Sequence, residues 1–531
     1  MLLPVLPLPA AIQDGDTVLL ECGRIYSGTL DLRGRREVTV RTQGDCGKAA
    51  ITPAQPVSGW VRDGQIWTAA SDIAPVMLQV GESFVPVAHH PNTPGGWLTG
   101  EGMGAALLKV NLPAHKLSGA TLVWRPEDWL IVRQTVLSDD RGLLRVASPA
   151  EAEASFRDQT PFYLEGQRWM LDSPGEWMHE HGRLYLWPVD GRSPEGRTWV
   201  SPEASAIDAR GSYRVTIKDI RIFLAERGID GADTSELFIA DTDILNSGQE
   251  AIRLGGRGAR LENVHVQGTQ QQGIRAEDDA QGVSITHCKI NDAGMLGMPR
   301  RSKGAIVFEQ SNGQFIAHNR IVNSAYIGIR VFRNATVMDN EIKGACLRMT
   351  DCGGIYTFAR DRQPLNTLIL RNHISGLLGR LSHAIYLDDF ANGVSVIDNR
   401  LINNPGGMQL HNAFGNLIRG NAFIASRHEH LLFNETASFA AISNNQISGN
   451  RFKSAADNPV YRLWSHRGGA HLPRFMALSH NRYEGTPARF AQLEQTGWVG
   501  ASDWVRYMDE ENPLFSAPRP LPQLARQPQK K

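Results

Sequence analysis

A short motif repeats every twenty-odd residues between Ile229 and Glu435, and this repeat constrains the fold more than any other feature. Each copy has an apolar anchor, an alternating strand and, in most copies, an Asn two positions before an apolar residue. Repeats of this length are typical of solenoids, and the β-branched residues with Asn and Gly at turns indicate strands. The sequence therefore predicts an all-β parallel β-helix with one rung per copy. The anchors are Ile229, Ile252, Ile274, Ile306, Ile329, Ile355, Ile385, Met408 and Leu432.

The two faces of the predicted strands differ in chemistry. Side chains alternate across a strand, so the anchors and the residues two positions later should point into the core. Most of these second residues are apolar, as expected for a core. The outward positions carry charged, amide and aromatic side chains, with Arg330, Tyr356, Tyr386 and Gln409 in one column and Glu309, Phe358, Asp388, His411 and Glu435 in the next. This outer face is therefore a candidate site.

A column of asparagines supports the same register. Stacked Asn side chains can hydrogen-bond from rung to rung and tolerate the backbone of tight turns. We therefore assign this column a structural role. Its predicted members are Asn319, Asn340, Asn372, Asn399, Asn421 and Asn445.

The chain divides by pattern into five segments. Residues 1–52 contain an N-terminal cap and the first rungs, and the period is lost in 53–200, which we predict to be an inserted β-rich domain packed on the helix. The main parallel β-helix is predicted for 201–450, followed by a C-terminal cap at 451–515. The tail at 516–531 is rich in Pro, Gln and Lys and is predicted to be disordered.

Composition excludes several classes of protein. Lys plus Arg equals Asp plus Glu at 55 each, which does not favour a nucleic-acid-binding protein. No stretch approaches the ~20 apolar residues of a membrane span. The N-terminal residues lack the basic region of a signal peptide, although we expect a secreted or periplasmic location.

Five cysteines leave at least one thiol unpaired, so we do not predict a disulfide scaffold. Cys22 and Cys46 lie about one rung apart, which fits either a disulfide or two buried thiols. Cys346 and Cys352 flank a predicted active-site loop. No Cys/His spacing resembles a zinc site, and we expect neither a metal nor another cofactor.

Three anchor spacings, of 32, 26 and 30 residues, are longer than the 22 or 23 residues of the shortest rungs, so the extra residues should project as loops. Long loops on a rigid scaffold are often functional. These loops are 291–303, 343–353 and 359–366 with 375–383. They flank the rungs that carry Tyr356, Tyr386 and Asp388.

Two motifs carry the candidate chemistry: Asp351-Cys-Gly-Gly-Ile-Tyr356 and His383-Ala-Ile-Tyr-Leu-Asp-Asp389. They place carboxylates within one or two rung spacings of each other. Glycoside cleavage needs such a pair, one to protonate the leaving oxygen and one to act as nucleophile or base. Such pairing also separates the two pKa values.

Each candidate residue also has a plainer interpretation. Asp351 precedes Gly-Gly and could be a turn former, and Asp389 is interpreted as a turn residue that caps Ala391–Gly393. His411 could be a general acid or base, a substrate ligand or a packing residue. His383 could do no more than hold Asp388 in position.

Other outward side chains are predicted to bind substrate. Aromatic rings offer flat surfaces for sugars, and the two arginines could hold hydroxyls or a uronate, although both kinds of side chain could equally pack under the long loops. The carboxylates Glu309 and Glu435 fit rim positions. The predicted substrate-binding set is Arg330, Tyr356, Phe358, Arg360, His383, Tyr386, Gln409, Glu309 and Glu435.

At these motifs the chain resembles right-handed β-helix glycoside hydrolases, such as glycoside hydrolase families 120 and 141. The upstream segments Pro161-Phe-Tyr-Leu-Glu165 and Leu171-Asp-Ser-Pro-Gly-Glu-Trp177 are also similar to a region before the helix in these proteins. The resemblance implies metal-independent acid–base cleavage of xylo- or fuco-type glycans, with Asp351 and Asp388 as the carboxylate pair. One departure is His411, which stands one rung after Asp388 where some relatives have a second carboxylate.

The sequence therefore predicts a glycoside hydrolase acting on a polysaccharide or oligosaccharide, with catalytic residues Asp351, Asp388 and His411. A polysaccharide lyase or C5-epimerase is an alternative, with Arg330 neutralising a uronate and His411 or Tyr386 as base or acid. A non-catalytic glycan-binding protein is a third interpretation, because fold alone does not determine function.

Overall fold

The structure is a computed structural model that describes residues 5–92, 96–112, 116–147, 155–299, 304–437, 439–454, 457–494 and 497–516. It contains two compact units, and each is described by itself below. The first unit is Met1–Val331 with Gly344–Cys352, and the second is Phe332–Lys343 with Gly353–Lys531. The tail predicted to be disordered lies almost entirely outside the described residues, as does part of the loop 291–303.

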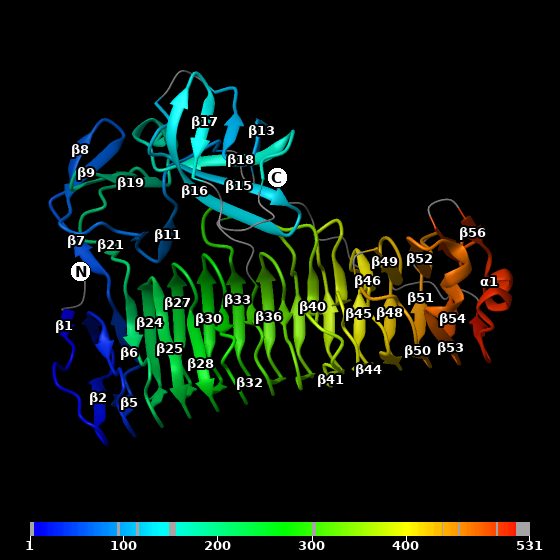
Figure 1. Ribbon diagram of the computed structural model, residues 1–531. Coiled ribbons are helices and arrows are strands. Elements are labelled where there is room, and N and C mark those ends of the chain that lie inside the picture. The colour runs from blue at the N-terminus through cyan, green and yellow to red at the C-terminus, as the bar shows by residue number, and fades with distance from the viewer. Residues whose placement is uncertain are drawn as a thin grey trace. The chain divides into compact units, whose positions relative to one another are not determined.

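Three stacks of parallel strands form the coil of the first unit (Figure 1). Stack A contains β1 (Val5–Pro7), β3 (Ile25–Ser27), β6 (Ala49–Thr52), β24 (Ile220–Ala225), β27 (Asp243–Ser247), β30 (His265–Thr269), β33 (Lys289–Ala293) and β36 (Arg320–Ser324). Stack B contains β2 (Thr17–Glu21), β5 (Thr39–Gln43), β23 (Thr216–Lys218), β26 (Phe238–Ala240), β29 (Arg260–Glu262), β32 (Ser284–Thr286) and β35 (Phe315–Ala317). Stack C contains β4 (Leu30–Asp31), β22 (Ser205–Asp208), β25 (Arg227–Ser235), β28 (Ile252–Arg257), β31 (Ile274–Ala276), β34 (Ile306–Phe308) and β37 (Ile329–Arg330).

The strands between β6 and β22 are antiparallel, in the region where the period of the sequence is lost. One sheet has the order β11 (Ser83–Val85), β10 (Met77–Val80), β21 (Thr198–Ser201), β7 (Gln55–Val57), and another has the order β19 (Glu176–Glu180), β20 (Arg183–Trp187), β9 (Ile66–Ala70), β8 (Val61–Asp63). The third has the order β12 (His89–His90), β18 (Thr160–Glu165), β13 (Leu98–Gly102), β14 (Leu107–Lys109), β17 (Leu143–Val146), β16 (Leu130–Asp140), β15 (Thr121–Glu127). A short 3-10 helix, η1 (Arg168–Met170), follows β18.

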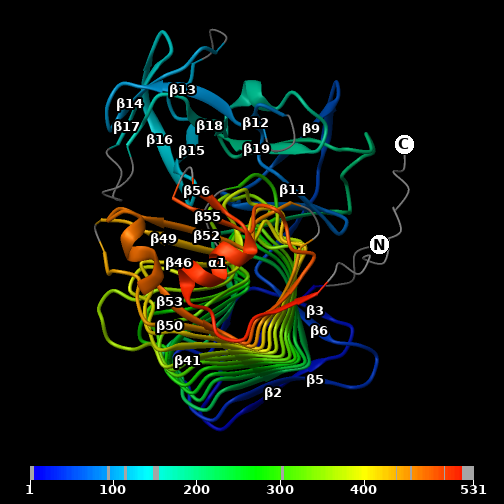
Figure 2. The same cartoon turned by 90° about the vertical axis from the view of Figure 1, so that its right-hand side faces the viewer.

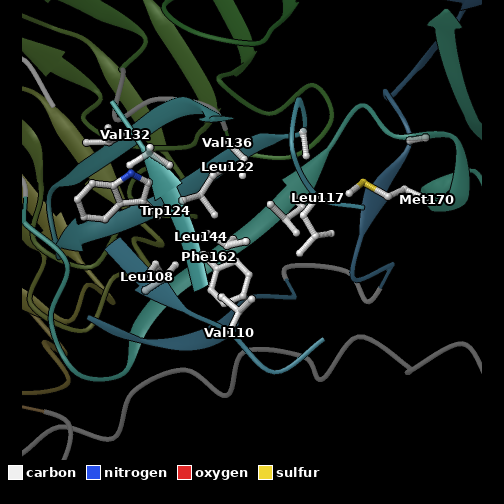
Figure 3. Packing of buried hydrophobic residues seen from close by; sticks show 14 of the residues in the cluster. Leu108, Val110, Leu117, Leu122, Trp124, Val132, Val136, Leu144, Phe162 and Met170 are labelled. Carbon is white, nitrogen blue, oxygen red and sulfur yellow. The ribbon is translucent and has the colours of Figure 1, made fainter. Parts of the chain in front are cut away.

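Pairing of β15 with β18 closes the third of these sheets on itself. Its interior is an apolar core of its own, in which Trp124, Leu144 and Phe162 are buried together (Figure 3). The region between β6 and β22 is therefore more than a set of surface loops, because it buries apolar side chains independently of the coil.

The second unit repeats the three-stack arrangement, and Figure 2 labels strands of stacks B and C on different sides of its coil. Stack A contains β39 (Glu341–Lys343), β42 (His373–Ser375), β45 (Arg400–Ile402), β48 (Ala422–Ile424), β51 (Arg451–Lys453), β54 (Arg482–Glu484) and β57 (Leu514–Ser516). Stack B contains β38 (Thr336–Met338), β41 (Thr367–Leu370), β44 (Val394–Ile397), β47 (Leu417–Arg419), β50 (Asn445–Ser448) and β53 (Met476–Ser479). Stack C contains β40 (Gly353–Thr357), β43 (His383–Leu387), β46 (Gly406–His411), β49 (Leu431–Glu435), β52 (Tyr461–Ser465) and β55 (Ala491–Leu493), followed by antiparallel β56 (Gly497–Val499).

Parallel pairing continues beyond Asn450, where the sequence predicted a cap. The strands β51, β52, β53 and β54 each pair in parallel with the preceding rung of their stack. The 3-10 helix η2 (Gly469–Arg474) and the helix α1 (Ala501–Met508) accompany these last rungs. The Asn-Xaa-apolar signal survives there as Asn450 and Asn481, but Trp and Arg residues around it obscured the repeat.

The predicted register is confirmed for most anchors. In the first unit Ile229 pairs with Ile252, which pairs with Ile274, followed by Ile306 and Ile329. In the second unit Ile355 pairs with Ile385, and Ile385 pairs with Met408. All of these anchors are buried. The prediction of an all-β parallel β-helix is therefore confirmed.

The prediction of Leu432 as an anchor is wrong by one residue. Met408 pairs with Leu431, and Leu431, Phe433 and Glu435 are the buried residues of β49. Because side chains alternate, a slip of one position exchanges the two faces of the strand. The run Leu431-Leu432-Phe433 fits either register by hydrophobicity alone.

The asparagine ladder is also confirmed, with one correction. Each Asn side-chain oxygen accepts the backbone N–H of the preceding Asn, as between Asn372 and Asn399 at 2.8 Å. The ladder runs through Asn340, Asn372, Asn399, Asn421, Asn450 and Asn481. Asn445, which we placed in this column, belongs instead to a second ladder, where its oxygen accepts the N–H of Asn416 at 3.1 Å.

Candidate active site

Asp388 lies at the C-terminal end of β43, where its carboxylate has two strong donors. The Tyr356 hydroxyl donates to Oδ2 over 2.6 Å, and Nδ1 of His411 lies 2.7 Å from Oδ1. Tyr356 stands on the preceding rung and His411 on the following one, so the parallel register brings the three together. A neutral His411 that donates from Nδ1 keeps Nε2 as a proton acceptor.

The next residue, Asp389, lies in a different electrostatic setting. Partial burial and the negative charge of Asp388 raise the pKa of Asp389, although the hydrogen bond from Asn412 and the His411 charge oppose the shift. Nδ2 of Asn412 lies 2.8 Å from Oδ1 of Asp389 and 2.9 Å from the Thr436 hydroxyl. The sequence favoured a turn role for Asp389 over catalysis, and its carboxyl group lies in the same cluster as Asp388 and His411.

Asp388, Asp389 and His411 each offer one ligand atom, and these atoms lie within 4.8 Å of one another. Two carboxylate oxygens and one imidazole nitrogen are a donor set that suits divalent cations. The cluster can therefore hold either a shared proton or a cation. The sequence predicted no metal, and a chelation experiment belongs in any test of the site.

Aromatic side chains surround the Tyr356 side of the cluster. The Tyr356 ring packs edge-on against Tyr386, with centroids 5.3 Å apart, and lies 6.0 Å from Phe358. The guanidinium of Arg360 is exposed and lies 5.9 Å from the Phe358 ring. Tyr386 and Gln409 are buried, at 5% and 6% exposure, so they shape the site more than they line it. Tyr356 and Phe358 are the half-buried rings.

His383 lies in a buried charge cluster and has no hydrogen bond to Asp388. Its Nε2 lies 3.0 Å from Oε1 of Glu429, whose Oε2 lies 3.1 Å from Nη1 of Arg462. Burial alone would raise the pKa of Glu429, but the His383 hydrogen bond and the positive charges of His383 and Arg462 lower it. A Cβ on Gly406 would collide with the His383 ring, so this glycine makes room for it. The expectation that His383 braces Asp388 is wrong, because the hydrogen-bond partner of its ring is Glu429, which is 46 residues away in sequence.

Glu435 is not a rim residue. It is fully buried, and Arg467 Nη2, Ser465 and the backbone N–H of Ile442 all donate to its carboxylate. Burial opposes ionisation, but these donors lower the pKa of Glu435. The corrected register of β49 places Asn434, not Glu435, beside His411.

Three predicted residues, Asp351, Arg330 and Glu309, belong to the first unit. Arg330 Nη1 lies 3.3 Å from Oε2 of Glu309. Asp351 is half-buried, and its backbone N–H lies 3.5 Å from the Asp128 carbonyl oxygen of the β15–β16 turn. The pairing of Asp351 with Asp388 stays a prediction.

Disulfides join Cys22 to Cys46 and Cys346 to Cys352, and Cys288 is the buried free thiol of the described chain. The first pair was one of two alternatives from sequence, whereas the second was missed as a bond. It closes the short loop that leads to Asp351.

Comparisons with known proteins agree with this architecture. A family model described as "Right handed beta helix region" matches residues 227–377. A solved structure named "Glycoside hydrolase" is 15% identical, with a TM-score of 0.58 over 81% of this chain and 89% of its own. The chain is a right-handed parallel β-helix protein.

Two other solved structures are more distant from this β-helix protein. The complex of XylC with xylose is 12% identical, with a TM-score of 0.46 over 97% of this chain and 83% of its own. The A-module of mannuronan C-5 epimerase AlgE6 from Azotobacter vinelandii is 13% identical, with a TM-score of 0.42 over 60% of this chain and 85% of its own. No curated protein matches significantly. Within the described residues, every helix is too short or too polar to cross a membrane.

Proposed function

We propose that this protein is a glycoside hydrolase in which Asp388 and Asp389 are the reacting carboxyl groups. The observation that carries the proposal is two adjacent carboxyl groups in different settings: Asp388 accepts from donors at 2.6 and 2.7 Å, whereas burial and the neighbouring charge raise the pKa of Asp389. Glycoside cleavage needs one protonated and one ionised carboxyl group. The structural neighbour with a TM-score of 0.58, itself named a glycoside hydrolase, supports this reaction class.

The roles follow from these protonation states. Asp389 donates a proton to the leaving glycosidic oxygen, and Asp388 attacks the anomeric carbon. We propose direct attack by Asp388, and the stereochemistry of the product tests it, because attack by a carboxylate gives retention of configuration. Tyr356 and Phe358 provide ring faces for sugar residues.

The two disulfides support a location in an oxidising compartment. Such bonds persist in secreted and periplasmic proteins and are rare in reducing cytoplasm. We therefore propose that the protein acts outside the cytoplasm on a polysaccharide or oligosaccharide.

A lyase or C5-epimerase is a second candidate, favoured by one observation. His411, oriented by Asp388, has Nε2 as a potential base, and the Tyr356 hydroxyl lies on the other side of the same carboxylate. These groups could abstract a proton beside a uronate and protonate the product. Against this, Arg330, expected to neutralise the uronate, is paired with Glu309.

The deciding experiment is a glycan screen that follows reducing ends and ultraviolet absorbance together. Wild type is compared with Asp388→Asn, Asp389→Asn and Asp351→Asn, with and without a chelator. Reducing ends without absorbance, lost in the first two variants and insensitive to chelation, support the hydrolase. Absorbance of an unsaturated product supports the lyase instead, and loss on chelation assigns the cluster to a cation. Glycan binding without turnover, unchanged in every variant, contradicts both enzymes and supports a binding protein.

A further inference from the structure

The first unit contains a cavity of about 850 Å³ that is independent of Asp388 and its neighbours. Sites for small molecules typically occupy ~300–1,000 Å³, so this cavity has the size of a binding site. One wall is the outward face of stack A, where Phe223, Leu245 and Gln267 follow one another on β24, β27 and β30. The opposite wall comes from the β10–β11 hairpin and β21, which belong to the antiparallel region.

The interior of the cavity combines aromatic and amide groups. Trp199 is buried and packs edge-on against Phe223 with centroids 5.7 Å apart, and Phe84 lies in the same apolar cluster. Nδ2 of Asn246 lies 2.9 Å from Oε1 of Gln79, and Gln79 in turn donates to the Gly81 carbonyl over 2.7 Å. These bonds join the coil to the hairpin. The cavity is therefore held by a hydrogen-bonded, aromatic frame rather than by loosely packed loops.

The lining carries charges of both signs, and Arg221 is its cation without an ion-pair partner among the described residues. It contains three cations, Arg24, Lys48 and Arg221, and one carboxylate, Glu82. Lys48 pairs with Asp243 at 2.9 Å and Arg24 approaches Glu21 at 3.5 Å. Within the described chain, Arg221 and Glu82 have no ion-pair partner, and both are exposed. Arg221 stands in the same column as Ile25 and Ala50, beside the aromatic wall.

We propose that this cavity binds a short acidic oligosaccharide whose carboxylate pairs with Arg221. Ring faces and amide groups suit sugar hydroxyls and C–H faces, and a guanidinium suits a carboxylate. The choice of a saccharide rests on the proposed function, whereas the choice of an anion rests on the exposed Arg221. The site contains no residue of the Asp388 cluster, so it acts as an anchoring site and not as part of the cleavage step.

The test uses the full chain with Asp388→Asn, so that a ligand is not consumed. Calorimetry measures binding of tetragalacturonate, of neutral xylotetraose and of inorganic phosphate at low and moderate salt. Into this background Arg221→Gln and Glu82→Gln are introduced separately. Arg419→Gln is the matched control, since it removes an exposed arginine on β47 that does not line this cavity.

We expect Arg221→Gln to weaken tetragalacturonate binding about tenfold, the effect of losing a charge-assisted hydrogen bond. Glu82→Gln should strengthen binding a few-fold by removing a like charge, and Arg419→Gln should leave it unchanged. Salt should weaken binding, because the rim charges are exposed. Equal affinity for xylotetraose, phosphate binding as strong as that of the saccharide, or no effect of Arg221→Gln would each overturn the proposal.

The outcomes separate this proposal from the proposed function. Tetragalacturonate binding that depends on Arg221, in a protein that cleaves no glycan, would keep the anchoring site and reject the hydrolase. Cleavage that depends on Asp388, with binding indifferent to Arg221, would do the reverse.

Discussion

The outward face of stack C has two very different regions. In the first unit, arginines of this face lie beside carboxylates on their own or neighbouring rungs: Arg253 lies 3.4 Å from Asp230 and 3.3 Å from Glu277. In the second unit, the same kind of strand position carries Tyr356, Tyr386 and Gln409, and Asp388 has neutral or titratable donors. Both regions are rich in charge. In the second, however, Asp388 and Asp389 are hydrogen-bonded by a tyrosine, a histidine and an asparagine, whereas an arginine takes this place in the first.

This comparison explains why charge on a strand face is a weak guide to function. An arginine beside a carboxylate fixes it in the ionised state and removes it from proton transfer. A tyrosine and a histidine hold Asp388 in place and leave it able to react. We therefore expect changes in the second region to affect activity and changes in the first to affect stability.

The largest expected effect comes from removing the charge of Asp388. Asp388→Asn keeps the shape but cannot attack or stabilise a developing positive charge, so kcat should fall about 10³–10⁴-fold. Glu277→Gln in the first region is the matched control and should stay within a few-fold of wild type. Initial rates with a purified glycan measure both. Equal losses in the two variants would mean that the two regions do not differ as we argue.

Asp389→Asn should reduce kcat about 10²–10³-fold, the range of general acid catalysis. The loss should be much smaller on an aryl glycoside whose leaving group needs no proton. The raised pKa of Asp389 keeps it protonated to higher pH than an ordinary Asp, so activity should fall on the alkaline side as Asp389 ionises. Asn412→Asp removes a donor to Asp389 and adds a like charge, so that alkaline limb should move to higher pH. A limb that stays in place would exclude Asp389 as the acid.

In the first region, Arg227→Met should destabilise the protein without a specific effect on catalysis. Arg227 lies 3.4 Å from Asp230 and 3.1 Å from Glu250, and both carboxylates are buried. Removing one partner of an isolated buried pair costs about 3–5 kcal/mol of unfolding free energy. Asp230 keeps Arg253 at 3.4 Å and Glu250 keeps Arg275 at 3.4 Å, so the loss here should be smaller than that range. Denaturant unfolding measures this loss, and Arg227→Met with Glu250→Gln should recover part of it. A fall in kcat of the folded protein, with stability unchanged, would contradict the comparison.

The features that could be predicted from sequence are those set by local pattern. The anchors Ile229 to Met408 predicted the register correctly because alternation is a local property of each strand. Asp388 and His411 were found together because they share a column in adjacent rungs. The error at Leu432 arose in a run of three apolar residues, where local pattern admits two registers.

The predicted site residues whose surroundings differ from expectation depend on contacts remote in sequence. His383 is held by Glu429, and Glu435 by Arg467, each from a different rung. A buried carboxylate and an exposed one look alike in a sequence until the compensating cation is placed. For Asp389 a turn role was favoured over catalysis because its raised pKa comes first from burial, which the motif does not show, and only then from the adjacent Asp388.

The smallest effect that we predict is for Tyr356→Phe. This variant keeps the ring and removes only the hydroxyl that donates to Asp388 over 2.6 Å. A hydrogen bond to a charged group contributes about 1.5–3 kcal/mol, so kcat should fall roughly 10–100-fold. Because the hydroxyl holds the Asp388 carboxylate in place, the loss should fall on kcat and leave KM nearly unchanged. Tyr163→Phe is the matched control: its hydroxyl donates to the Pro299 carbonyl in the first unit, so it should leave both constants unchanged. If Tyr356→Phe raised KM and left kcat unchanged, the tyrosine would act on the substrate and not on Asp388. The contrast between the two regions would then rest on His411 alone.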